Sequence, residues 1–179
     1  MNEIIIQNIY PDRKNLRLPD FLYSSSCAYF VTICTYHKQY LFGEIKNGTM
    51  HLNSNGNIVK KCWNDLQTHY VGINNDVFVV MPNHLHGIIL IRDEYGRDGS
   101  KPSPTKPHNL SEIVRAFKTY SSKGINELHQ TPGISLWQRS FYEHVIRNDN
   151  DYNEICEYIF YNPAKWETDR ENIDRKQEL

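Results

Sequence analysis

The centre of the expected fold is the stretch Val79-Val80-Met81-Pro82-Asn83-His84-Leu85-His86-Gly87-Ile88-Ile89-Leu90. It contains two compact apolar runs with a Pro-Asn turn between them, which is typical of two adjacent strands inside a sheet. Side chains two positions apart on a strand leave by the same face, so His84 and His86 point to one place at the mouth of the sheet. Two neutral imidazoles at this spacing suit a divalent cation. The alternative interpretation is a pair of polar residues on a hairpin.

The regions on both sides of this stretch complete an alternating pattern of strands and helices. Runs of β-branched, aromatic and apolar residues predict strands at 28–36, 76–81, 84–92 and 136–146. Apolar residues at helical spacing predict helices at about 55–70, from Asn109 or Ser111 to near Gly124, and at 149–161 before Pro163. The order is β-α-β-β-α-β followed by a helix. We therefore expect an α+β fold of the ferredoxin-like, split-βαβ type with an antiparallel sheet.

Length and composition indicate one folded domain. The chain has 179 residues, of which 39% are hydrophobic and 23% charged. We expect an extended lead-in at 1–27, a domain at 28–166 with a flexible loop at about 94–108, and a charged tail at 167–179. The four cysteines form no CxxC pair and no zinc-finger spacing, which is typical of small buried residues in a reduced, intracellular protein. No apolar stretch is long enough to span a membrane.

Positive charge is concentrated in one part of the chain. The net charge is -1, which argues against a uniformly basic coat for nucleic acid. Between Lys101 and Arg147, however, seven Lys/Arg stand against three acidic residues. This surplus is of the kind that meets phosphate, although an ordinary solvated helix face has the same composition.

The last predicted helix carries a second set of polar residues. Tyr158 and Asn162 are four residues apart, so they share one helix face. An asparagine carbonyl is a hard oxygen ligand, and with two imidazoles it makes a three-ligand site with open positions, which suits Mg²⁺ or Mn²⁺. In the alternative interpretation, Tyr158 is a half-buried core residue and Asn162 ends the helix.

Four segments spread along most of the chain carry a family resemblance. They are Ala28–Thr35 with Leu41–Gly43, Val80–Ile88, Leu136–Arg147 and Tyr158–Pro163. In their order and spacing they resemble the REP-associated tyrosine transposases, within the single-tyrosine HUH-endonuclease class of insertion-sequence transposases.

The resemblance implies a role for each of four residues. His84 and His86 fall on the family's histidine pair, Tyr158 on its nucleophilic tyrosine and Asn162 on its third metal ligand. It further implies one divalent ion, Mg²⁺ or Mn²⁺, and a substrate of single-stranded DNA beside a hairpin. The reaction it implies is strand cleavage and rejoining through a 5′-phosphotyrosine link. We expect a cytoplasmic, nucleoid-associated bacterial protein, and leave open whether Tyr158 acts in its own subunit or in a homodimer.

Residues of the basic stretch are the predicted contacts to DNA. Arg115, Lys118, Lys123 and Arg139 are expected to meet phosphate. Three aromatic residues are interleaved with them: Trp137, Phe141 and Tyr142. Each would contribute about 1–3 kcal/mol to binding if it stacks on a base, and the alternative interpretation is that it packs within the sheet. Two other functions remain open at this level: a metal-dependent nuclease that uses water, and a protein that binds DNA hairpins without cutting them.

Overall fold

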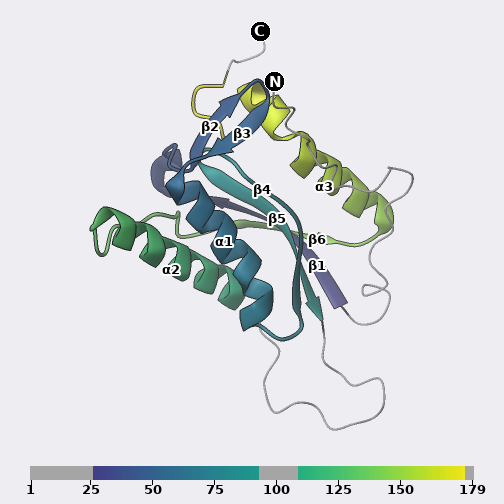
Figure 1. The fold of residues 1–179 in the computed structure, drawn as a ribbon. Helices are drawn as coiled ribbons and strands as arrows, with labels where there is room; N and C mark the ends of the chain where they lie inside the picture. The colour runs from purple at the N-terminus through teal and green to yellow at the C-terminus, as the bar shows by residue number, and fades with distance from the viewer. Residues whose placement is uncertain (1–25, 93–108, 176–179) are drawn as a thin grey trace, which may run out of the picture.

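A computed structural model describes residues 26–92 and 109–175 (Figure 1). The strands are β1 (Ser26–Cys34), β2 (Gly43–Lys46), β3 (Thr49–Leu52), β4 (Ile73–Val80), β5 (His84–Arg92) and β6 (Tyr142–Ile146). The α-helices are α1 (Ser54–His69), α2 (Leu110–His129) and α3 (Asp149–Tyr161), and two short 3-10 helices are η2 (Tyr36–Lys38) and η3 (Pro163–Thr168). The predicted α+β class and the predicted order of elements are both confirmed.

The main sheet is antiparallel and has the strand order β4-β5-β1-β6. The connection from β1 through α1 to β4 passes over β5, and the connection from β5 through α2 to β6 passes over β1. Each crossover therefore leaves room for one strand, which is the split-βαβ arrangement that the sequence predicted. The short β2–β3 hairpin lies outside this sheet.

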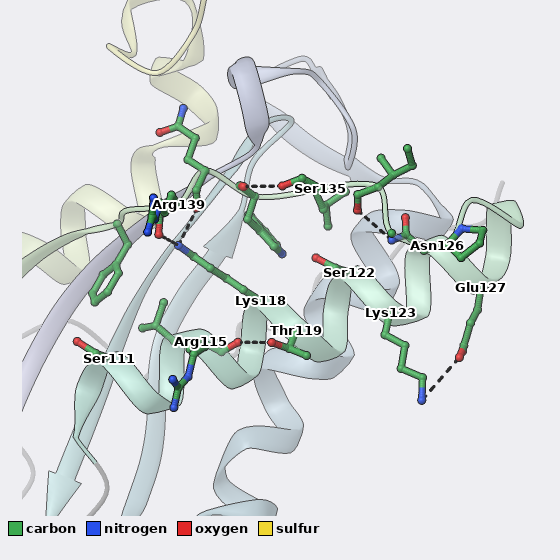
Figure 2. Close-up of a pocket in the computed structure, with 18 of the residues that line it drawn as sticks. Ser111, Arg115, Lys118, Thr119, Ser122, Lys123, Asn126, Glu127, Ser135 and Arg139 are labelled. Atoms are coloured by element: carbon green, nitrogen blue, oxygen red, sulfur yellow. Dashed lines mark hydrogen bonds and ion pairs between the residues drawn. The ribbon is translucent and has the colours of Figure 1, made fainter.

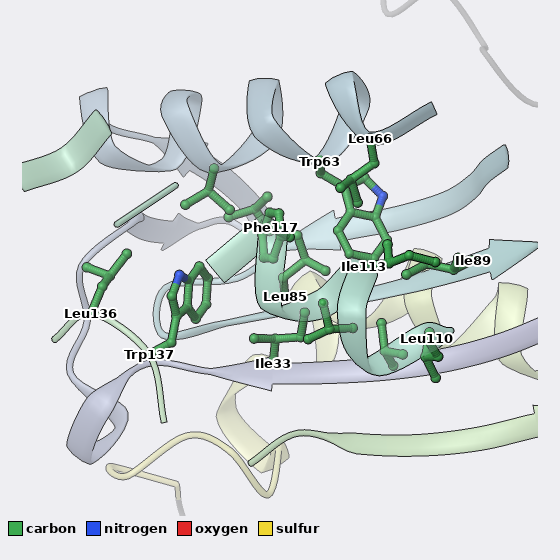
Figure 3. Packing of buried hydrophobic residues seen from close by; sticks show 14 of the residues in the cluster. Ile33, Trp63, Leu66, Leu85, Ile89, Leu110, Ile113, Phe117, Leu136 and Trp137 are labelled. Carbon is green, nitrogen blue, oxygen red and sulfur yellow. The ribbon is translucent and has the colours of Figure 1, made fainter. Parts of the chain in front are cut away.

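Helices cover both faces of the sheet, with α1 and α2 on one side and α3 on the other (Figure 1). Successive strand residues point to opposite faces, so each central strand feeds two cores. In β1, Val31 and Ile33 pack toward α1 and α2, as Figure 3 shows for Ile33, whereas Phe30 packs toward α3. The near-continuous apolar sequence of β1 and β5 follows from this two-sided burial.

Gly87 allows close packing between α1 and the sheet. A Cβ atom at this position would lie 2.5 Å from Cζ2 of Trp63, whose ring is fully buried between α1 and β5. The indole lies directly on the strand because glycine has no side chain there.

Two element boundaries differ from the prediction by five residues or more. The helix α2 begins after Asn109, which forms a capping box with Glu112, but it continues through Gly124 to His129 because Ile125 extends its buried side. The last strand starts at Tyr142 rather than residue 136, because Trp137 forms only an isolated bridge to Thr35 and the segment around it packs against α2.

Parts of the predicted domain plan fall outside the described residues. These parts are most of the lead-in and the whole of the loop at 94–108, so the domain boundaries stay predictions. The described part of the tail, 167–175, is folded: Asp169 and Asn172 are buried. Of the four cysteines only Cys156 is buried, and Cys27 is exposed, which corrects the prediction that all four are buried. None of the described helices is long and apolar enough to cross a bilayer.

Candidate active site

Two histidine side chains meet at the start of β5, on the face of the sheet that α3 covers. Leu85, between them, points into the core beneath α1 and α2, so His84 and His86 project to the opposite face. Both side chains are buried, and their ring centroids lie 4.4 Å apart. The strand spacing therefore brings the two imidazoles together, as the sequence predicted.

Asn83 determines which nitrogen of His84 carries the proton. The Asn83 Nδ2 donates to the backbone oxygens of Lys38 at 3.1 Å and Glu171 at 2.7 Å, so its Oδ1 is an acceptor. This oxygen lies 2.7 Å from Nδ1 of His84, so Nδ1 is the protonated donor and Nε2 keeps its lone pair. That Nε2 is buried and, within the described residues, has no hydrogen-bond partner. Burial is the main cause that lowers the pKa of His84 to about 4, so the ring is neutral at pH 7.

The His86 ring is held from three sides. Its Nδ1 lies 2.8 Å from the Thr32 hydroxyl on the paired strand, and its face stacks on Phe30 at a centroid distance of 5.4 Å. Its Nε2 lies 3.1 Å from the hydroxyl of Tyr158. Burial, aided by the neighbouring His84, lowers the pKa of His86 well below its ordinary value. This ring is therefore also neutral, with Nε2 directed at Tyr158.

The Tyr158 side chain comes from α3 and closes the site. The helix begins at Asn148, whose side chain accepts from the Asp151 backbone amide, and its apolar side packs Ile159 against the sheet. The Tyr158 ring packs edge-on against Phe30 at 5.9 Å and remains 39% exposed. Burial of its hydroxyl raises the pKa of Tyr158 to about 12. The hydroxyl is thus protonated at neutral pH, and the ring borders solvent.

Asn162 lies at the end of α3, as predicted, and is joined by an acidic residue that the sequence did not indicate. The Asn162 Nδ2 donates to Asp169 Oδ2 at 2.9 Å, which leaves its Oδ1 buried and without a hydrogen-bond partner in the described chain. One ligand atom from each of His84, His86 and Asp169 lies within 4.8 Å of the other two. Asp169 follows η3, where no periodic pattern marks it. The only sequence signal was an acid seven residues after Asn162.

Residues 169–174, which we name the C-terminal strap, are fixed against two turns of the sheet. The Glu171 carboxylate pairs with Lys38 Nζ at 3.1 Å and accepts from the thiol of Cys34 at 3.3 Å. The Tyr40 hydroxyl donates to Asn172 Oδ1 at 2.5 Å. These contacts bring Asp169 to the histidines, so a residue predicted to lie in a tail becomes part of the site.

The donor atoms fit a divalent cation. Two of them, His84 Nε2 and Asn162 Oδ1, are buried and unpaired in the described structure, and such atoms are rare in proteins unless they have a further partner. With His86 Nε2 and the Asp169 carboxylate they form a mixed nitrogen and oxygen set suited to Mn²⁺ or Mg²⁺. His86 offers a single lone pair at Nε2, so an ion on that nitrogen displaces the hydroxyl of Tyr158.

A cavity of about 1060 Å³ lies between α2 and residues 130–141 (Figure 2). The helix α2 covers the opposite face of the sheet from α3, which carries Tyr158 (Figure 1). All five predicted DNA-binding residues line the cavity: Arg115, Lys118 and Lys123 from α2, and Trp137 and Arg139 from the loop. Its acidic lining residue, Glu127, lies 3.8 Å from Lys123 as an exposed ion pair. The structure therefore brings four cations of the basic stretch to one surface.

Lys118 and Trp137 are held by contacts within the protein. The Lys118 ammonium donates to the backbone oxygens of Gln138, Arg139 and Ser140 at 2.9, 3.3 and 2.9 Å, so it holds the loop against α2 (Figure 2). The Trp137 ring is buried (Figure 3), and its Nε1 donates to the Ser121 hydroxyl at 2.9 Å. Both residues line the same cavity as the other three arginine and lysine side chains, and their contact with DNA stays a prediction.

Comparisons with known proteins give relatives in sequence and in structure. No family model matches the chain. It is 37% identical over 171 residues to an uncharacterized protein of Haemophilus influenzae, covering 90% of this chain and 94% of that one. It is 29% identical over 90 residues to a REP-associated tyrosine transposase of Escherichia coli, covering 50% of this chain and 44% of that one.

A solved structure shares the fold. The structure of a REP-associated tyrosine transposase bound to a REP hairpin superposes with a TM-score of 0.54 at 19% identity, over 87% of this chain and 72% of that one.

Proposed function

We propose that this chain, which belongs to the REP-associated tyrosine transposases, cleaves and rejoins single-stranded DNA at hairpin-containing sites. The names of its relatives support a transposase-type enzyme, and the hairpin bound to the structural relative supports a DNA partner. One observation carries the proposal: the hydroxyl of Tyr158 lies 3.1 Å from Nε2 of His86, beside a buried group of metal-ligating side chains. A DNA substrate would keep the protein in the bacterial cytoplasm, at the nucleoid.

In this reaction Tyr158 is the nucleophile. Its Oη attacks the phosphorus in line, a bond from phosphorus to Oη forms, and the bond from phosphorus to the 3′ oxygen breaks. The tyrosine proton passes to solvent, which the partly exposed ring reaches, and the leaving oxygen takes up a proton as a free 3′-OH. The product is a 5′-phosphotyrosine link. Attack by another 3′-OH on this link restores a phosphodiester of similar energy and releases the tyrosine, so no ATP is consumed.

The protonated hydroxyl needs help to react. With the pKa of Tyr158 raised to about 12, only about one molecule in 10⁴ carries the tyrosinate at pH 8. A divalent ion held by His84, His86, Asn162 and Asp169 would bind a non-bridging phosphate oxygen and offset the charge that develops in the transition state. The protein itself positions the reacting groups: Phe30 packs against Tyr158, and the C-terminal strap holds Asp169 beside the histidines.

The tyrosine and the histidine pair belong to the same chain in this arrangement, so we propose that Tyr158 acts in its own subunit. A homodimer stays a prediction, which sedimentation velocity at assay concentration tests. Arg115, Lys118, Lys123 and Arg139 are the proposed phosphate contacts beyond the site, since they line one cavity on the opposite face.

The experiment is incubation of the full chain with single-stranded hairpin DNA and Mn²⁺, followed by denaturing electrophoresis. We expect a covalent protein–DNA adduct that Tyr158→Phe abolishes. The matched control is Tyr161→Phe, which changes an exposed tyrosine three residues further along the same helix and leaves the adduct intact. Cleavage that survives Tyr158→Phe would assign the reaction to water. Binding without cleavage by any variant would make the protein a hairpin-binding protein.

A further inference from the structure

Arg170 stands at the open edge of the site, in the strap directly after Asp169. Its side chain is 60% exposed, yet two neighbours fix it. Its Nε lies 3.3 Å from Glu171 Oε1, and its Cζ lies 5.5 Å from the centroid of the Tyr142 ring. Among the described residues no hydrogen bond or ion pair engages the two terminal Nη groups. The guanidinium of Arg170 is thus oriented through its Nε, and its two Nη groups remain able to donate to a ligand.

The fixed guanidinium and the reactive tyrosine are linked through one aromatic side chain. Phe30 packs edge-on against Tyr142 at 6.3 Å and edge-on against Tyr158 at 5.9 Å. Arg170 therefore lies over a ring that borders the same phenylalanine as the nucleophile. Consistent with this placement, the charge of Arg170 lowers the pKa of Tyr158, against the larger effect of burial and the effect of Asp169.

The charges around Arg170 leave it suited to an anion. Glu171 is already paired with Lys38 at 3.1 Å, and it contacts Arg170 only through Nε. Asp169 is bound by Asn162 and by the backbone amide of Glu171. A phosphate diester brings one negative charge and two non-bridging oxygens, which match the paired donors of a guanidinium better than a single ammonium.

We propose that Arg170 binds the phosphate that Tyr158 attacks, through its free guanidinium edge, and that Tyr142 is a positioning residue that holds the guanidinium plane. The inference rests on the proposed function, since it names the group that receives the scissile phosphate in that reaction. It assigns different roles to the two residues at the start of the strap, Asp169 and Arg170. Asp169 faces the histidines, and Arg170 faces the substrate.

The test is the single-turnover rate of adduct formation on hairpin DNA with Mn²⁺. Removal of one fixed donor to a developing charge costs about 10²–10³-fold in comparable sites, and we expect a loss of that size for Arg170→Gln. Arg170→Lys restores part of the rate, because the charge returns without the paired donors. The matched control is Arg175→Gln, an exposed arginine directly after the strap, which leaves the rate unchanged. Tyr142→Ser slows the reaction, and Tyr142→Phe restores it, because a phenyl face is enough to hold the guanidinium.

A neutral substrate separates phosphate binding from a structural role. Replacing the scissile phosphate by a methylphosphonate removes the charge that Arg170 pairs with. The replacement should slow the unmodified protein more than it slows Arg170→Gln. Two outcomes would overturn the inference and leave the proposed function intact. In the first, the methylphosphonate slows both proteins equally. In the second, the Arg170→Gln rate lies within threefold of the unmodified rate while Tyr158→Phe abolishes the adduct. Absence of any Tyr158-dependent adduct in the unmodified protein would instead refute the proposed function.

Discussion

Replacing Thr32 by valine tests whether the histidine pair is a metal site. The Thr32 hydroxyl lies 2.8 Å from Nδ1 of His86, and both side chains are buried on paired strands. A metal needs the lone pair of Nε2, so the proton must sit on Nδ1, and the hydroxyl accepts it. Valine has the same shape and fits a strand, so Thr32→Val removes this hydrogen bond and little else.

Two effects of Thr32→Val are expected, one on metal affinity and one on folding stability. Loss of a partner that orients a ligating histidine lowers metal affinity by about 10–100-fold, or about 1.4–2.8 kcal/mol. Leaving the buried Nδ1–H unpaired also costs about 1–3 kcal/mol of folding free energy, which urea unfolding measures separately. The assay is calorimetric titration with Mn²⁺.

The matched control is Thr119→Val, because Thr119 donates to the carbonyl of Arg115 within α2, on the far side of the sheet. We expect no change in Mn²⁺ affinity for this variant. Unchanged affinity in a folded Thr32→Val protein would refute the reasoning, since it would mean that the Nε2 of His86 does not hold the ion.

Three further predictions concern the site, a cysteine and the core. Tyr158→Phe binds Mn²⁺ more tightly than the unmodified protein in the absence of DNA, because it frees the lone pair that the hydroxyl occupies; weaker binding in calorimetry would contradict this. Burial raises the pKa of the Cys34 thiol to about 12, so at pH 8 only about one molecule in 10⁴ carries the thiolate. We therefore expect a thiol reagent to label Cys34 much more slowly than the exposed Cys27, and to label it faster as the pH rises. Equal labelling rates at the two cysteines would contradict this prediction. Gly87→Ala destabilises the fold by about 1–3 kcal/mol in urea unfolding, because its Cβ would lie 2.5 Å from the Trp63 ring; an unchanged midpoint would show that the helix shifts without cost.

The parts of the site on regular elements were predictable from sequence. His84 and His86 follow the two-residue period of β5, and Tyr158 and Asn162 follow the helical period of α3. In each case a local rule fixes the direction of the side chain. The tertiary fold then only has to place α3 over that face of the sheet, as the order of the elements implies.

The parts on irregular segments were not predictable, because their path depends on contacts distant in the sequence. Asp169 reaches the histidines only because the strap binds turns near Lys38 and Asn83, which lie more than 80 residues earlier in the chain. Trp137 belongs to a segment that the composition predicts as one strand, but it forms only an isolated bridge to Thr35, and its indole is buried and bound to Ser121 of α2. The β-branched and aromatic content of 136–146 therefore indicated a strand but not the residue at which it begins.

The central claim is that Tyr158 is joined to DNA at the histidine centre. The measurement is mass spectrometry of the tryptic peptide of residues 148–165 after reaction with hairpin DNA and Mn²⁺. This peptide contains Tyr152, Tyr158 and Tyr161, so fragmentation distinguishes them. The account predicts a nucleotide 5′-phosphate on Tyr158 in the unmodified protein and no modified peptide from His86→Ala. Modification of Tyr152 or Tyr161 instead, or cleaved DNA with no modified tyrosine, would contradict it.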